Sequence, residues 1–215
     1  MKENDDFGAL GKAIGEQLQA IEGKPVPYIR GVEGVSLENM KSFSASLATY
    51  GGAALFYIEG ITPEAGLYDQ PENTIPISFE DVNNAKSELT DGDPVEADFV
   101  SLGCPHLSIK EIARIADILE GKQVVKEFWI TTARPTKQIA DRMGYTEVIE
   151  ASGAKFAADT CCVVAPIKGR FSALVTDSAK ACYYAAGKNQ FQTILKPFDE
   201  VVYTALGESR QEAVQ

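Results

Sequence analysis

The sequence predicts an α/β fold in which a mainly parallel sheet is flanked by helices. Short apolar runs of strand type alternate with amphipathic helical segments along most of the 215 residues, and the connections between them are short. Apolar residues make up 45% of the chain, which is enough to build a core. We expect a single domain over residues 1–215, with a possible minor boundary in the proline-rich loop at 60–77.

The first part of the chain opens with helical periodicity. Apolar residues recur at helical spacing from Phe7 to Ile21, and Gly23 and Pro25 end the pattern. Ser78 is a typical N-cap, and the helix after it is expected to turn Phe79, Val82 and Ala85 inward. The expected elements are helices at 7–22, 36–50 and 78–89, an extended segment at 27–32 and a buried strand at 53–58.

The second part alternates strand and helix more regularly. Ser108 is an N-cap candidate, and Glu111 lies in the first turn, where a negative charge is favourable to the helix dipole. This pattern predicts an amphipathic helix at 109–119. The other expected elements are strands at 97–102, 124–131, 148–152, 156–165, 171–175 and 191–195, and helices at 136–143, at 178–186 and from Pro197 onward.

Composition excludes several classes of protein. A formal net charge of −11 argues against a nucleic-acid binder, because phosphates are met by basic surfaces. No apolar run reaches the about 18 residues of a membrane span, and the polar, acidic residues 1–6 are neither a signal nor a transit peptide. Four cysteines are too few for a disulfide scaffold of this length. We therefore expect a cytoplasmic protein that binds neither nucleic acid nor membrane.

Two cysteine motifs carry the strongest chemical signal. Gly103-Cys104-Pro105-His106 follows one predicted strand, and Asp159-Thr160-Cys161-Cys162 interrupts another. Residues past the carboxyl ends of parallel strands line the crevice where ligands bind, so two thiols there could hold a metal or an iron–sulfur cluster. Neighbouring strand residues point to opposite faces, so only one of the paired cysteines is expected to serve such a site.

Structural and enzymatic alternatives remain open for these motifs. Cys104 and His106 could be a buried cysteine and a turn histidine, or they could form the centre of a thiol enzyme. Cys182 lies on the apolar side of a predicted helix and is expected in the core. The chain has no Cys-x-x-Cys pair, no Gly-x-Ser-x-Gly elbow, no Walker loop and no Gly-x-Gly-x-x-Gly after a strand.

Two further strand-to-helix junctions carry polar residues. The segment Thr131-Thr132-Ala133-Arg134 offers hydroxyls, backbone donors and a guanidinium to a carboxylate or phosphate. The segment Thr176-Asp177-Ser178-Ala179-Lys180 lies at an equivalent junction. Ser178 could be only an N-cap and Lys180 only a solvated residue, but several such junctions together favour a site.

These motifs together resemble one family. The segments Phe7-Gly8-Ala9-Leu10-Gly11, Gly103-Cys104-Pro105-His106-x-Ser108, Thr131-Thr132-x-Arg134, Asp159-Thr160-Cys161 and Ser178-Ala179-Lys180 occur in the order seen in aconitase X. The resemblance implies an aconitase-like three-layer α/β/α fold and an iron-dependent hydro-lyase. Known substrates in the family are cis-3-hydroxy-L-proline and 5-phosphomevalonate. The acidic surface favours a hydroxyproline-like substrate for this chain.

The resemblance also implies a site and its partners. It assigns Cys104 and Cys161 as metal ligands of an iron or iron–sulfur centre whose third cysteine this chain lacks. We predict catalytic roles for His106, Ser178 and Lys180. Substrate contacts are expected from the polar residues Ser108, Thr131, Thr132 and Arg134.

The chain is expected to correspond to the C-terminal half of a large subunit. Its expected partners are the missing N-terminal half, a small swivelling subunit that supplies a serine base, and a small-molecule substrate. The alternatives are a binding or scaffold domain that has lost activity, and the Cys-His thiol enzyme.

Overall fold

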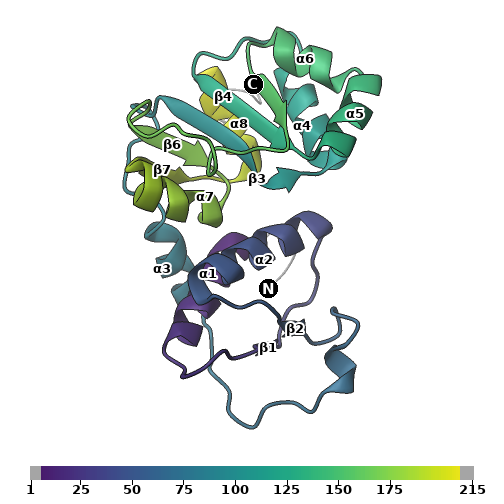
Figure 1. The fold of residues 1–215 in the computed structure, drawn as a ribbon, viewed down its shortest axis with the longest axis vertical. Helices are drawn as coiled ribbons and strands as arrows, with labels where there is room; N and C mark the ends of the chain where they lie inside the picture. The colour runs from purple at the N-terminus through teal and green to yellow at the C-terminus, as the bar shows by residue number, and fades with distance from the viewer. Residues whose placement is uncertain (1–5, 209–215) are drawn as a thin grey trace. The chain divides into compact units, whose positions relative to one another are not determined.

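The computed structural model describes residues 6–208 and separates them into two compact units, one ending at Glu88 and the other starting at Leu89 (Figure 1). This division differs from the expected single domain with a minor boundary in the loop at 60–77. The loop is not a boundary because side chains before and after it share one core, in which Val82 packs with Phe7, Leu47 and Ile58.

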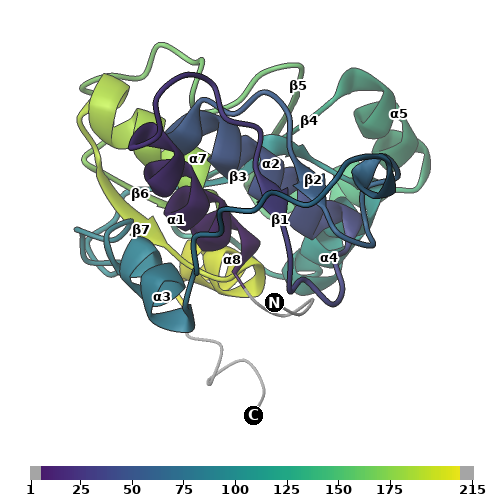
Figure 2. The same ribbon diagram turned by 90° about the horizontal axis from the view of Figure 1, so that it is seen from below.

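The first unit is built on two helices, α1 (Phe7–Gln19) and α2 (Leu37–Gly51), which lie side by side (Figure 2). Glycines allow this close packing, because a Cβ on Gly11 would lie 2.7 Å from the carbonyl oxygen of Phe43. A Cβ on Gly15 would lie 2.8 Å from the amide nitrogen of Gly51. The Phe-Gly-Ala-Leu-Gly motif is therefore a helix-packing motif in this structure.

The rest of the first unit is short and irregular. Strands β1 (Tyr28–Ile29) and β2 (Tyr57–Ile58) pair in parallel, and a short 3₁₀ turn η1 (Ala65–Leu67) precedes helix α3 (Phe79–Ser87). Val82 and Ala85 are buried as expected, but Phe79 is 67% exposed, so the prediction that it points inward is wrong. Phe79 opens the helix and borders a surface groove instead of the core.

In the second unit, the described residues form a parallel sheet in the order β5-β4-β3-β6-β7. Its strands are β3 (Phe99–Leu107), β4 (Glu127–Thr132), β5 (Lys155–Ala158), β6 (Ala173–Thr176) and β7 (Gln192–Leu195). The helices are α4 (Ile109–Leu119), α5 (Arg134–Arg142), α6 (Tyr145–Ala151), α7 (Ala179–Tyr184), which continues into the π-helical turn η2 (Ala185–Asn189), and α8 (Phe198–Leu206). The predicted α/β fold with a parallel sheet is confirmed.

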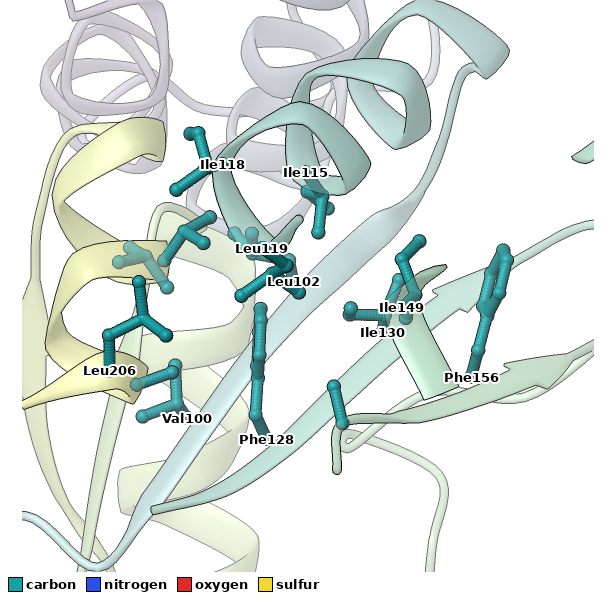
Figure 3. Close-up of a cluster of buried hydrophobic side chains, with 14 of the residues drawn as sticks. Val100, Leu102, Ile115, Ile118, Leu119, Phe128, Ile130, Ile149, Phe156 and Leu206 are labelled. Atoms are coloured by element: carbon teal, nitrogen blue, oxygen red, sulfur yellow. The ribbon is translucent and has the colours of Figure 1, made fainter. Parts of the chain in front are cut away.

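The sheet is covered on both faces because alternate strand residues point to opposite sides. Even-numbered residues of β3, such as Val100 and Leu102, pack with Ile115 and Leu119 of α4, and helices α5, α6 and α8 add to the same core (Figure 3). On the other face, Phe99 packs with aromatic side chains and with residues of α7 and η2. The second unit is thus a three-layer α/β/α structure.

Several predicted strands differ from the observed elements. Residues 148–151 form the end of α6, with Ser152 as its C-cap, rather than a strand, because Val148 and Ile149 reach the core together with Tyr145 at helical spacing. The strand expected at 156–165 ends at Ala158, where Asp159 takes a positive φ of 57° and turns the chain away.

No helix in the described residues 6–208 is both long and apolar enough to span a membrane.

Candidate functional site

The candidate site lies where the carboxyl ends of β3, β4, β5 and β6 meet. β3 and β6 are neighbours in the sheet, and the chain leaves them toward opposite faces, into α4 and α7 respectively. Such a switch point opens a crevice at the strand ends, which is where α/β sheets bind ligands. The structure brings both cysteine motifs and both polar junctions to this edge.

Hydrogen bonds from side chains of β4 hold the irregular end of β3 in place. The pairing register shifts between Leu102 and Leu107, and Gly103 adopts a φ of 114°. The Thr131 hydroxyl donates to the Gly103 carbonyl at 3.0 Å, and the Thr132 hydroxyl donates to the Leu107 carbonyl at 2.6 Å. Both threonines are buried, so these residues, expected to bind substrate, hold the Cys104 loop in place.

The thiols of Cys104 and Cys161 contact each other although 57 positions separate them in the sequence. Cys104 is buried, and its thiol lies within hydrogen-bonding reach of the thiol of Cys161. That bond, together with the backbone amides of Val164 and Val163, lowers the pKa of Cys161 against the opposing effect of burial. The same bond and burial raise the pKa of Cys104. The pair therefore favours one thiolate stabilised by a thiol.

The other two cysteines are packed into the core. Burial raises the pKa of Cys162 to about 11, and its thiol makes a hydrogen bond with Ser101. Burial raises the pKa of Cys182 to about 12, and its thiol makes a hydrogen bond with Thr193. Their expected role as core residues agrees with this burial, and of the adjacent pair it is Cys161 whose thiol interacts directly with that of Cys104.

Arg134 is held at the rim of the site by Asp159. The Asp159 carboxylate accepts hydrogen bonds from the Arg134 backbone amide at 2.9 Å and from its Nε at 2.8 Å. These two bonds lower the pKa of Asp159, the side-chain bond contributing more. The Arg134 side chain stays 72% exposed, so its guanidinium is oriented yet open to a ligand. The contact between Asp159 and Arg134 was not expected from the sequence, because it joins two loops that lie 25 residues apart in the chain.

His106 links the loop after β3 to the loop after β5. Its Nε2 lies 3.0 Å from the Thr160 carbonyl oxygen, and because a carbonyl only accepts, Nε2 carries the proton. The side chain is exposed, and its charge acts to lower the pKa of Cys161.

Among the remaining predicted site residues, Ser178 and Ser108 make structural hydrogen bonds, and Lys180 lies near Cys104. The buried Ser178 hydroxyl donates to the Cys104 carbonyl and accepts from the Ala181 amide at 3.0 Å, so it caps α7 and supports the cysteine loop. Ser108 caps α4 through a reciprocal capping box with Glu111. Lys180 is half-buried, and its charge acts to lower the pKa of Cys104, against the stronger effects that raise it.

The described residues offer part of a metal site. Among residues 6–208, no group of three or more His, Cys, Asp or Glu side chains is arranged to hold a metal ion. The adjacent sulfur atoms of Cys104 and Cys161 do suit iron or an iron–sulfur centre, for which thiolates are the usual protein ligands. The structure thus fits two ligands of such a centre.

Comparison with known families matches both units. A family model described as aconitase X second domain matches residues 1–89, and one described as aconitase X third domain matches residues 97–207. The chain also resembles the crystal structure of Thermococcus kodakaraensis aconitase X in its holo-form, with a TM-score of 0.82 and 31% sequence identity. That match covers 93% of this chain and 51% of the other.

Curated relatives carry two names. The phosphomevalonate dehydratase large subunit of Methanothermobacter thermautotrophicus is 39% identical over 187 residues, which are 85% of this chain and 45% of the relative. The cis-3-hydroxy-L-proline dehydratase of Pseudomonas aeruginosa is 32% identical over 204 residues, which are 86% of this chain and 35% of the relative. The chain therefore spans half or less of these relatives.

Proposed function

Because the chain belongs to the aconitase X family, we propose that it forms part of the large subunit of a hydro-lyase that dehydrates a small hydroxy acid. The observation that carries the proposal is the contact between the Cys104 and Cys161 thiols at the sheet's switch point. Soft sulfur ligands beside the exposed guanidinium of Arg134 combine a metal-binding pair with a site for an anionic substrate.

Cys104 and Cys161 would hold an iron or iron–sulfur centre, with the third ligand outside the described residues. When bound, iron with an open coordination position supplies Lewis-acid chemistry at a substrate hydroxyl. Ser178, Thr131 and Thr132 act as positioning residues in this proposal, because their hydroxyls fix the backbone on both sides of Cys104. A fixed ligand loop keeps the donor atoms in place for the metal.

The charged residues of the site provide recognition. Asp159 orients the Arg134 guanidinium, which can bind a carboxylate through two parallel N–H groups. Lys180, at the start of α7, adds a second positive charge near Cys104. His106 presents an imidazole at the same rim and can hold or donate a proton there. The base that removes the substrate's carbon-bound proton would come from the small swivelling subunit.

The similar proteins favour 5-phosphomevalonate over cis-3-hydroxy-L-proline as the substrate of this chain. The acidic surface favours a hydroxyproline-like substrate, but net charge describes the whole chain and not the site. The identity to a phosphomevalonate dehydratase large subunit reaches 39%, against 32% for the two cis-3-hydroxy-L-proline dehydratases. Arg134 and Lys180, with Lys196 at the end of β7, also place three cations at the strand ends. We therefore put 5-phosphomevalonate first and cis-3-hydroxy-L-proline second.

An assay of the assembled enzyme tests the reaction. The chain is combined with the missing large-subunit part and a small subunit, and dehydration of both substrates is measured. We expect activity on one of them and its loss in Cys104→Ser, whereas Cys182→Ser, a buried cysteine bonded to Thr193, retains it. Activity that survives Cys104→Ser would refute the proposal.

Iron reconstitution tests the ligand assignment on the 215-residue chain alone. We expect weak, substoichiometric iron after incubation with iron and sulfide, and a further decrease in Cys104→Ser and Cys161→Ser but not in Cys182→Ser. The readouts are iron per chain and the visible absorbance of the cluster. A tight, stoichiometric cluster that survives Cys104→Ser would contradict the assignment.

A further inference from the structure

Strand β1 has an open edge in the described residues. The Pro27 and Ile29 carbonyls accept hydrogen bonds from β2 at 2.9 Å each. Because backbone groups alternate along a strand, the amides and carbonyls of Tyr28 and Arg30 point away from β2. Residues 6–208 place no strand at that edge. A parallel pair of two-residue strands is too small to be stable alone, and parallel sheets are normally continued and covered.

An apolar groove of about 640 Å³ lies beside this strand. In Figure 1 the segment that leads from β2 to α3 loops below β1, on the side of β1 away from β2. Apolar side chains line the groove from α1, from residues 25–32 around β1, from the loop at 70–78 and from the start of α3. They include Leu10, Ile14, Leu18, Val26, Ile75 and Phe79. Val26 is 47% exposed and Ile75 is 51% exposed, so the lining is open to a partner.

The relatives indicate what covers this surface. The matched family models are named as the second and third domains, and the phosphomevalonate dehydratase large subunits have about twice the length that this chain spans. Large subunits of the family therefore contain a further, first-domain polypeptide. An apolar groove next to a free strand edge suits a permanent partner that adds a strand, since obligate interfaces resemble a divided core.

We infer that an extended, apolar segment of the polypeptide equivalent to the aconitase X first domain adds to the open edge of β1 and fills this groove. The main chain of that segment pairs with the outward groups of Tyr28 and Arg30. Its alternate side chains enter the apolar groove. The inference rests on the proposed large-subunit role for the identity of the partner, and it concerns a surface that shares no residue with the candidate site.

Binding of a defined probe tests the inference. The probe is the portion of the Methanothermobacter thermautotrophicus large subunit outside its 187-residue match, and it is titrated into the full 215-residue chain. Val26→Lys and Ile75→Lys change the groove at half-exposed positions. Leu67→Lys is the matched control, because Leu67 is 78% exposed in the same unit and does not line the groove. Circular dichroism checks that each variant is folded.

We expect each groove variant to weaken binding at least about tenfold and Leu67→Lys to change it less than about threefold. Hydrogen exchange at the Tyr28 and Arg30 amides is expected to slow when the probe binds. The inference is overturned if the unmodified chain does not bind the probe, or if the control weakens binding as much as the groove variants. It is also overturned if the chain dimerises and the groove variants abolish that dimer, because a second copy then fills the groove.

The outcomes separate this inference from the proposed function. Binding with protection of β1 but no dehydratase activity in the assembly would retain the inference and refute the proposed reaction. Dehydratase activity without protection of β1 would refute the inference and retain the proposed function.

Discussion

Replacement of Gly103 by alanine tests whether the geometry of the cysteine loop is fixed by backbone contacts. Gly103 has a φ of 114°, a region that residues with a Cβ rarely adopt. A Cβ placed there would lie 2.2 Å from the carbonyl oxygen of Thr131. No side-chain rotation can relieve this contact, because its nearest atom belongs to the backbone of β4.

Two separate costs determine the expected magnitude. Forcing an alanine into this conformation costs about 1–3 kcal/mol, and overpacking against the Thr131 backbone costs about another 1–3 kcal/mol. We therefore expect Gly103→Ala to lower the free energy of unfolding by about 2–6 kcal/mol, a large share of the about 5–15 kcal/mol that stabilises a typical domain. With a urea slope of about 2 kcal/mol/M, the unfolding midpoint falls by about 1–3 M.

Fluorescence of Trp129, the single tryptophan of the chain, reports the unfolding of the second unit. The matched control is Gly121→Ala, because Gly121 also has a positive φ, 70°, but a Cβ there would meet no atom within 4 Å. The control carries only the conformational cost, about 1–2 kcal/mol. If the free energies of unfolding of the two variants agree within about 0.5 kcal/mol, the proposed contact between Gly103 and Thr131 does not constrain the loop.

Two further predictions concern charged residues of the second unit. Burial alone would raise the pKa of Asp98, but hydrogen bonds from the Ala173 and Ser172 amides and the Ser172 hydroxyl hold this pKa below its ordinary value. Asp98→Ala should therefore lower the free energy of unfolding by about 1 kcal/mol above pH 5. In urea denaturation, the difference in this free energy between the variant and the unmodified chain should disappear as the pH falls below about 4. A difference that does not depend on pH would contradict this prediction. Arg134→Ala should change the free energy of unfolding by less than about 1 kcal/mol, because the bond between Arg134 and Asp159 is exposed. The same variant should lower kcat/KM of the assembled enzyme at least about tenfold. An unchanged kcat/KM would show that Arg134 does not belong to the site.

Local signals in the sequence predicted the elements that local interactions decide. The helix at 109–119 matches α4, because Ser108 and the apolar stripe act within a few residues of each other. The prediction that strand ends bring the cysteine motifs together also agrees with the contact between Cys104 and Cys161. That prediction used only the general rule that parallel strands end at one edge of the sheet.

Features that depend on long-range contacts could not be read from one sequence. The split between Cys161 and Cys162 was predicted from strand alternation, but the strand ends at Ala158, and the cysteines diverge in the loop beyond it. The bond between Arg134 and Asp159 depends on the pairing of β4 with β5, which no local pattern shows. The hydroxyls of Thr131 and Thr132, which are predicted to contact substrate, donate to backbone carbonyls of β3, a contact that depends on strand pairing.

The proposed ligand pair of Cys104 and Cys161 and the inferred docking edge of β1 would both be completed by the same further polypeptide of a large subunit. If that polypeptide supplies the third ligand, its addition should raise the iron content of the complex in a manner that depends on Cys104. Val26→Lys should reduce the iron content only when the concentration of the added polypeptide is limiting, because the groove contributes binding affinity and no metal ligand. At a saturating concentration of that polypeptide, the iron content should recover. Cys104→Ser should not recover at any partner concentration, since it removes a donor atom. Recovery of Cys104→Ser at saturation would show that the iron is held without this thiol, whatever fills the groove.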